Sequence, residues 1–202
     1  MPHYSVASPS RFQQKIKRSS FICFLFPISS AEEAQEFISS HNKDFANATH
    51  NCFAYICGFE QEIQYYSDAG EPHGTAGKPI LNALLRAGMT NILAIVTRYY
   101  GGIKLGVKGL IDAYGGTVEL ALEQALKTIS SKQLSFRVSL DYALADQLKN
   151  LINSLNGTIL NIDWGKRVNI ALRVPEKQAG PLLEFLDGYR GQSRLNYHQE
   201  ET

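Results

Sequence analysis

The order of hydrophobic patterns in about the last 70 residues restricts the fold more than any other feature of this chain. Alternating apolar residues predict strands, and apolar residues at helical spacing predict amphipathic helices. After the polar stretch KTISSKQLS, the patterns predict strand, helix, strand, strand, helix and strand at residues 134–140, 142–155, 158–163, 168–174, 176–186 and 193–197. A βαββαβ order in so short a segment is typical of the ferredoxin-like arrangement. We therefore predict a ferredoxin-like domain over residues 132–202.

The preceding part of the chain, residues 1–131, is interpreted as a second α+β domain. Two strands meet near residues 17–20, and a helix begins after Ser30, where Glu33 completes a capping pattern. Further strands are expected at residues 50–59 and 91–100, and further helices at about 80–88 and 106–127. Between them, SDAGEPHGTAGKP reads as a turn-rich loop. The chain is thus expected to form two α+β domains.

Composition excludes several classes of protein. The net charge of +1 on 202 residues gives no overall attraction to nucleic acid or membranes, so any electrostatic function has to be local. No apolar run reaches the length of about 18 residues that a membrane-spanning helix needs. The three cysteines Cys23, Cys52 and Cys57 are too few and odd in number for a disulfide framework. We therefore expect a cytoplasmic protein without a membrane partner.

The segment between Pro72 and Ile111 carries basic residues but no acidic one. It also holds seven glycines, which permit close approach of the backbone, and two of its loops lead into helix N-termini, where free N–H groups attract anions. One interpretation is an anion-binding patch; the other is that these side chains only solvate the outer faces of helices. The five basic residues are Lys78, Arg86, Arg98, Lys104 and Lys108.

Two stripes of side chains follow the long helix predicted at residues 106–127. At 100° per residue, the broad apolar stripe is expected to pack on the sheet, and it contains Val107, Ile111, Tyr114, Val118 and Leu122. The second stripe consists of the small residues Gly109, Ala113 and Gly116. A solvent-facing stripe usually carries charged residues, so small residues here indicate that something approaches the helix backbone closely, either another element of the domain or a ligand or partner.

No reaction can be derived from the residues of the turn-rich loop. GTAGKP lacks both the upstream glycine and the following Ser or Thr of a phosphate-binding P-loop. Asp68, Glu71 and His73 are of metal-ligating types, but such residues usually close turns, and nothing in the spacing organises a second shell around them. We predict no catalytic residue, no metal site and no cofactor.

Three segments together resemble the IMPACT family, also called UPF0029: YSDAGEPHGTAGKP, AIVTRYYGGIKLG and GLIDAYGG. The resemblance covers essentially the whole chain. It implies that the first domain has the fold of the second domain of ribosomal protein S5, and that the second domain resembles the ferredoxin-like domain V of the translocation elongation factor. Eukaryotic members act in translational control, but they carry an additional RWD domain that is not expected in this chain. The chain has Ala69 where many relatives have a second acidic residue, which weakens any role for paired carboxylates in the loop.

The resemblance and the local charge together predict a non-enzymatic protein that binds RNA or the ribosome and is linked to the regulation of translation. Phosphate contacts are expected from Lys78, Arg98, Lys104 and Lys108, base stacking from Tyr99 and Tyr100, and close backbone approach at Gly101 and Gly102.

Two alternatives remain open. One is an enzyme or sensor that binds a small anionic or phosphorylated ligand at the turn-rich loop, whose candidate residues are Asp68, Glu71, His73, Gly74, Thr75 and Gly77. The other is an adaptor that binds a protein partner through the small-residue face of the long helix.

Overall fold

The computed structural model describes residues 3–200, which divide into two compact units, one ending at Ser130 and the other beginning at Ser131. Each unit has a hydrophobic core of its own. The predicted combination of two α+β domains is confirmed.

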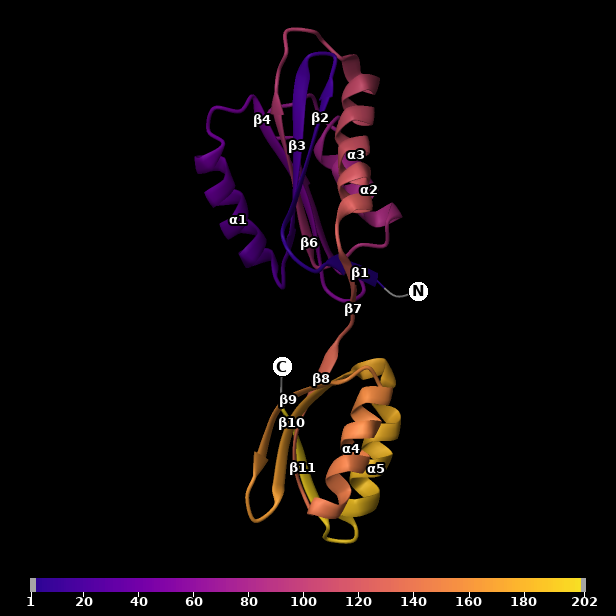
Figure 1. Ribbon diagram of the computed structural model, residues 1–202. Helices are drawn as coiled ribbons and strands as arrows, with labels where there is room; N and C mark the ends of the chain where they lie inside the picture. Colours follow the sequence, from indigo (N-terminus) through magenta and orange to yellow (C-terminus); the bar gives the residue numbers. More distant parts are fainter. Residues whose placement is uncertain (1–2, 201–202) are drawn as a thin grey trace. The chain divides into compact units, whose positions relative to one another are not determined.

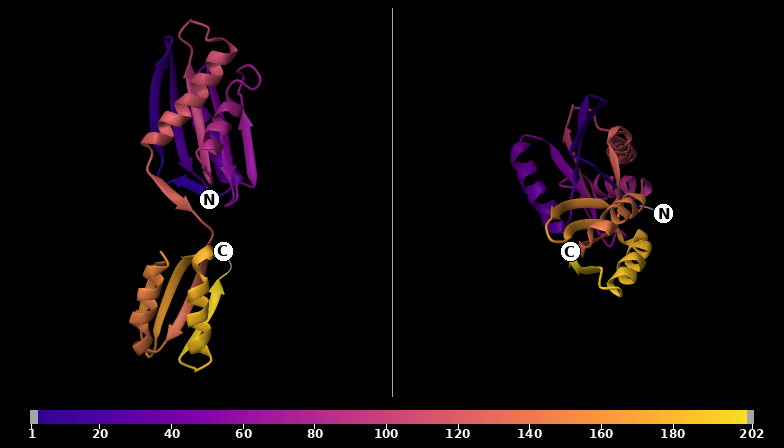
Figure 2. Two further views of the ribbon diagram at one scale, coloured as in Figure 1. Left: turned by 90° about the vertical axis from the view of Figure 1, so that its right-hand side faces the viewer. Right: turned by 60° about the horizontal axis from the view of Figure 1, so that its bottom comes forward.

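The N-terminal unit is built on a five-stranded antiparallel sheet in the order β2-β3-β6-β4-β5. Its strands span Ser10–Ile16 (β2), Ser19–Pro27 (β3), His50–Cys57 (β4), Ile63–Ser67 (β5) and Ile92–Tyr99 (β6). Helices α2 (Gly77–Arg86) and α3 (Gly106–Gln124) cover one face, and α1 (Ala31–Asp44) covers the other (Figures 1 and 2). A short sheet of β1 (His3–Val6) and β7 (Lys127–Ser130) completes the unit.

Strand β6 lies at the centre of this sheet because both of its faces are apolar. Residues 92–98 are all buried, as expected for a strand that is covered on both sides. Helix α1 begins at the predicted cap, where Ser30 Oγ accepts a hydrogen bond from the Glu33 N–H at 3.2 Å. The short strands β1, β5 and β7 were not predicted, since their few residues show no distinctive apolar period.

Helix α3 packs on the sheet with a face that differs from the predicted one in the first turns, whereas Tyr114, Val118 and Leu122 are buried as predicted. Val107 and Ile111 are exposed, at 62% and 39%, whereas Ala113 from the predicted small-residue face is buried. The helix is turned so that Ala113 faces the sheet, and the hydroxyl of the buried Thr117 is satisfied by the carbonyl of Ala113 at 2.5 Å. The predicted packing face was therefore wrong in its first turns. The buried side of α3 consists of Leu110, Ala113, Tyr114, Gly115, Thr117, Val118, Ala121 and Leu122.

The C-terminal unit has the βαββαβ arrangement, with the antiparallel strand order β11-β8-β10-β9. Its strands are β8 (Gln133–Leu140), β9 (Thr158–Trp164), β10 (Val168–Pro175) and β11 (Leu195–Glu200). Helices α4 (Tyr142–Ser154) and α5 (Gly180–Arg190) cover one face, and within the described residues of this unit, 131–200, no helix covers the other face, which we call the bare face (Figure 1). The second helix begins later than predicted, because Glu176–Gln178 form a separate 3₁₀ turn.

Candidate functional site

Two loops meet at one end of the N-terminal unit, the β2–β3 turn and the β6–α3 loop (Figures 1 and 2). Gly101 makes this contact possible, because a Cβ at this position would lie 2.0 Å from the carbonyl oxygen of Arg18. The Gly101 N–H also donates a hydrogen bond to Ser19 Oγ at 3.2 Å. The segment at residues 100–102 therefore serves to bring the loops together.

The β2–β3 turn consists of Lys17 and Arg18 alone, and both have positive φ angles, 44° and 70°. Two-residue hairpin turns with positive φ at both positions strongly prefer Asn-Gly. A residue with a Cβ is destabilised in this conformation by about 1–2 kcal/mol. Two long basic side chains therefore occupy a turn for which they are poorly suited, and strain of this kind is common at functional sites.

Four cations and an aromatic ring are exposed at this end, which we call the basic tip: Lys17, Arg18, Lys104, Lys108 and Tyr100. Neither loop contains an acidic residue. Among residues 3–200, none of the four cations forms an ion pair. The N-terminus of α3 adds to the positive potential, since its first turn lacks both an acidic residue and a side-chain cap.

Arg98, which was predicted to contact phosphates, is buried beneath the tip in an ion pair. Its Nη1 lies 2.5 Å from Glu71 Oε1, and only 6% and 3% of the two side chains are exposed. The hydroxyl of Tyr114 donates a hydrogen bond to the same oxygen at 2.8 Å. The guanidinium also faces the rings of Phe21 and Tyr100 at 5.5 and 5.3 Å. Arg98 is neutralised inside the domain, so its charge is not presented to a ligand.

The other predicted phosphate- and base-contacting residues are distributed over three places. Lys104, Lys108 and Tyr100 belong to the basic tip, together with Gly101 and Gly102 in the β6–α3 loop. The Tyr99 hydroxyl donates a hydrogen bond to Asn47 Oδ1 at 3.1 Å and is held there. Lys78 lies in a groove between α2 and α3. Lys17 and Arg18 were missed as site residues, although a basic pair at a two-residue hairpin turn is a readable signal.

In the turn-rich loop, the Asp68 carboxylate occupies the N-terminus of α2, the position at which a helix can bind a phosphate. Asp68 accepts hydrogen bonds from the N–H groups of Gly74, Ala76 and Gly77 at 2.8, 3.0 and 2.8 Å, and so caps α2. Burial raises the pKa of the Asp68 carboxyl, but these N–H donors and the nearby His73 outweigh it and hold the pKa below its usual value. These N–H groups are therefore not free for an anionic ligand.

The remaining loop candidates have structural partners. Thr75 is buried and donates a hydrogen bond to the carbonyl of Pro72 at 2.6 Å. Gly77 lies directly against the backbone of Ser67, because a Cβ there would be 2.6 Å from the Ser67 carbonyl carbon and oxygen. His73 is almost fully exposed, with Nδ1 3.7 Å from Asp68 Oδ2. This loop serves to close the domain around the start of α2.

Replacing Asp68 by asparagine is expected to lower the free energy of unfolding by about 1–3 kcal/mol at pH 7, because a charged acceptor of several N–H groups is lost. Because the pKa of the Asp68 carboxyl is lower in the folded than in the unfolded protein, the ionised carboxylate stabilises the fold at pH values above the unfolded-state pKa of about 3.9. This stabilisation disappears as the pH falls through the folded-state pKa. The difference between wild type and variant should therefore shrink below about pH 4. Urea unfolding followed by circular dichroism at several pH values measures it, and a constant difference would contradict this role.

The small residues of α3 have three different surroundings. Gly115 faces α2, where a Cβ would lie 3.7 Å from the carbonyl oxygen of Pro79, whereas a Cβ at Gly116 would meet only open space. A Cβ at Gly109 would approach Leu105 Cβ at 3.1 Å. Gly115 and Gly116 line the groove of about 560 Å³ between α2 and α3. Its wall has mixed charge, contributed by Lys78, Arg86, Asp112 and Glu119, with Arg86 and Glu119 paired at 2.5 Å.

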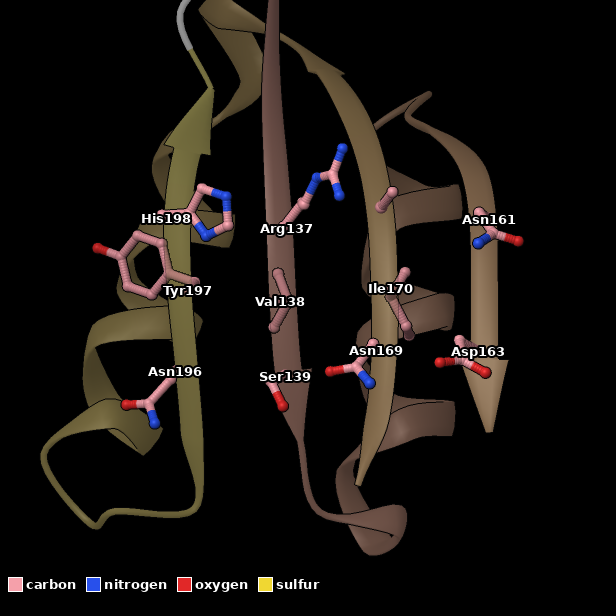
Figure 3. Close-up of a pocket in the computed structure, with 11 residues that line it drawn as sticks. Arg137, Val138, Ser139, Asn161, Asp163, Asn169, Ile170, Asn196, Tyr197 and His198 are labelled. Carbon is pink, nitrogen blue, oxygen red and sulfur yellow. The ribbon is translucent and has the colours of Figure 1, made fainter. Parts of the chain in front are cut away.

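The bare face of the C-terminal sheet is shallow and polar, with a hollow of about 480 Å³ (Figure 3). On the central strands, this face presents Arg137, Ser139, Asn169 and Ala171. These central strands offer no Phe, Tyr or Trp side chain on this face to stack on a base, in contrast to the four-stranded sheets of RNA-recognition modules. The edge strands add Asn161, Asp163, Asn196 and His198.

Residues 3–200 contain neither a cluster of metal-ligating side chains nor a helix suited to a membrane. No group of three or more His, Cys, Asp or Glu side chains is arranged to hold a metal ion. None of the helices in this part of the chain combines the length and the apolar character needed to cross a membrane.

Comparisons with known proteins match almost the entire chain to proteins and domains of one family. The family model described as the Impact N-terminal domain matches residues 17–122, and one described as a domain of unknown function (DUF1949) matches residues 138–187. The chain is 36% identical to IMPACT family member YvyE of Bacillus subtilis over 184 residues, covering 91% of this chain and 85% of that protein.

Two further matches have similar coverage. IMPACT family member YigZ of Escherichia coli is 36% identical over 181 residues, covering 89% of this chain and 87% of that protein. A crystal structure of a hypothetical protein is 33% identical, covers 100% of this chain and 98% of its own, and has a TM-score of 0.67. The matched segments include the turn-rich loop, the β6–α3 loop and the start of α3. The chain therefore belongs to the IMPACT family.

Proposed function

We propose that this protein binds structured RNA of the translation machinery through the basic tip of its N-terminal domain and acts in the regulation of translation without catalysing a reaction. The observation that carries the proposal is the group of four exposed cations at this end: Lys17, Arg18 and Lys104 on two adjoining loops that contain no acidic residue, and Lys108 in the first turn of α3. Because the whole chain has a net charge of only +1, this local concentration is the feature that would attract phosphates.

The tip combines two kinds of contact that RNA-binding surfaces use. Lys17, Arg18, Lys104 and Lys108 suit phosphate oxygens, which account for much of the affinity of such surfaces. Tyr100 is 44% exposed, and the buried Arg98 guanidinium lies 5.3 Å from its ring centre. A ring held in this way can stack on an unpaired base. The link to translation rests on the resemblance of the two domains to ribosomal protein S5 and to the elongation factor.

Replacing Lys104 and Lys108 together by alanine is expected to weaken RNA binding and to flatten its salt dependence. Each lost phosphate contact lowers the slope of log K against log salt by about 0.7–0.9, so the double variant should lose about 1.4–1.8. Fluorescence anisotropy with a labelled RNA hairpin between 50 and 200 mM salt measures this slope.

The matched control is the double variant Lys43→Ala and Lys166→Ala, since both lysines are exposed and lie outside the tip. It removes the same total charge and should leave the slope nearly unchanged. Equal effects of the two double variants would show that overall charge, rather than the tip, drives binding. Absence of RNA binding by the wild type at low salt would refute the proposal.

A protein partner at the same end is the second candidate, and the exposed Val107 and Ile111 favour it. These apolar side chains lie one helical turn apart on α3, where a solvated helix would carry polar residues. Co-sedimentation with ribosomes before and after nuclease treatment separates the candidates. RNA binding predicts that nuclease abolishes the association, whereas a nuclease-resistant association that Val107→Ser weakens would favour the protein partner.

A further inference from the structure

Strand β5 ends the five-stranded sheet with an edge that carries none of the usual protections. Edge strands present unpaired N–H and C=O groups, and natural proteins guard them with charged residues, proline, bulges or a covering element. The five residues of β5, Ile63–Ser67, include no charge and no proline, and the strand pairs with β4 in an unbroken register. Its first three residues are exposed.

The other sheet edges in residues 3–200 are protected. Strand β2 carries Arg11 and Lys15, and β11 carries Glu200. Strand β9 carries Asp163 (Figure 3), and its register with β10 is broken by a bulge. In the short sheet, β7 begins with a lysine, and the outer side of β1 is bonded to the backbone of residues 88 and 90. The open edge of β5 is thus an exception among the sheet edges of this described range.

An apolar surface accompanies the open edge on the α1 side of the sheet. Ile63 and Tyr65 point to this side and are 50% and 51% exposed. The Tyr65 ring stacks on Phe53 and Tyr55, with ring centres 6.1 and 5.6 Å apart. A strand added to β5 would therefore gain backbone hydrogen bonds and cover exposed aromatic and aliphatic side chains at the same time.

We infer that β5 pairs with β5 of a second copy of this chain, so that two N-terminal units share one ten-stranded sheet. An antiparallel pairing centred on Gln64 places Ile63 of each copy opposite Tyr65 of the other, a favourable pair of β-branched and aromatic residues. In this register Glu62 faces Tyr66, and within residues 62–66 no two charges of like sign oppose each other. The two-fold arrangement uses the same edge in both copies and closes on itself.

Pairing of β5 with β2 of another copy is less favourable. It would leave one free edge on each end and extend into a filament, and it would bring the apolar β5 against Arg11 and Lys15. The two-fold β5 contact is small, so we expect a reversible dimer that depends on protein concentration. This inference uses a different face from the basic tip and stands independently of RNA binding.

Sedimentation velocity over a wide range of protein concentration tests the inference on the full chain. The wild type should shift from monomer to dimer as its concentration rises. Tyr65→Lys is expected to weaken the dimer about tenfold or more, since a charge on each edge discourages pairing. The matched control Gln13→Lys places the same charge at an exposed position on β2 and should leave the dimer intact.

A disulfide provides a second readout that gives the register. In the two-fold pairing the Gln64 Cα atoms lie about 4.5–5.5 Å apart, which a disulfide can bridge. Gln64→Cys is therefore expected to form a covalent dimer on mild oxidation, whereas the native cysteines Cys23, Cys52 and Cys57 are buried and should not react. The inference would be overturned if the protein remained monomeric at every concentration and its Gln64→Cys variant formed no disulfide. It would also be overturned if the β5 edge bound only other proteins.

Discussion

Replacing Glu71 by glutamine is expected to lower the free energy of unfolding by about 3–5 kcal/mol, the cost of leaving a buried charge without its partner. Glu71 holds Arg98 through the 2.5 Å contact described above, and both side chains are almost completely buried. Removing the carboxylate charge leaves the guanidinium desolvated and unpaired. The Tyr114 hydroxyl would also lose a charged acceptor.

Urea unfolding followed by circular dichroism measures this effect, and two further variants test its cause. Glu71→Gln combined with Arg98→Met should recover much of the lost stability, because no unpaired charge is then buried. Glu36→Gln removes a carboxylate from an exposed position on α1 and should change the stability by about 0.5 kcal/mol or less. A double variant as unstable as Glu71→Gln alone would show that the ion pair is not the source of the loss.

Replacing Lys17 by asparagine and Arg18 by glycine is expected to stabilise the protein and to weaken RNA binding in the same molecule. Asn-Gly is the preferred pair for a turn with positive φ at both positions, so the free energy of unfolding should rise by about 2 kcal/mol. Two tip cations are lost at the same time, and the salt slope of RNA binding should fall by about 1.4–1.8. The opposite signs of the two effects separate function from folding.

Urea unfolding and RNA anisotropy on the same preparations provide both measurements. Lys43→Gln combined with Lys166→Gln is the matched control, since it removes two exposed charges elsewhere and should move neither quantity strongly. A more stable turn variant that binds RNA as tightly as the wild type would remove Lys17 and Arg18 from the site. A less stable variant would show that the basic pair itself favours the turn.

Local patterns were sufficient for much of the architecture. The capping pattern at Ser30 and Glu33 correctly placed the start of α1, and the strand predicted at residues 91–100 is present as β6. These features depend on neighbouring residues, which the sequence shows directly. The rotation of α3 was misjudged because Val107 and Leu110 begin two overlapping apolar stripes, and only contact with the sheet selects between them.

The sequence by itself determined the order of helices and strands, the ferredoxin-like pattern of the second half and the resemblance to the IMPACT family, because each depends on local spacing or on contiguous motifs. Only the tertiary structure decided which charges face solvent. Arg98 is neutralised by Glu71, 27 positions away along the chain, whereas Arg18 and Ser19 contact Gly101 from more than 80 positions away. The electrostatic role of a side chain is set by its neighbours in space and by its distance from water, and neither can be read from its neighbours in sequence.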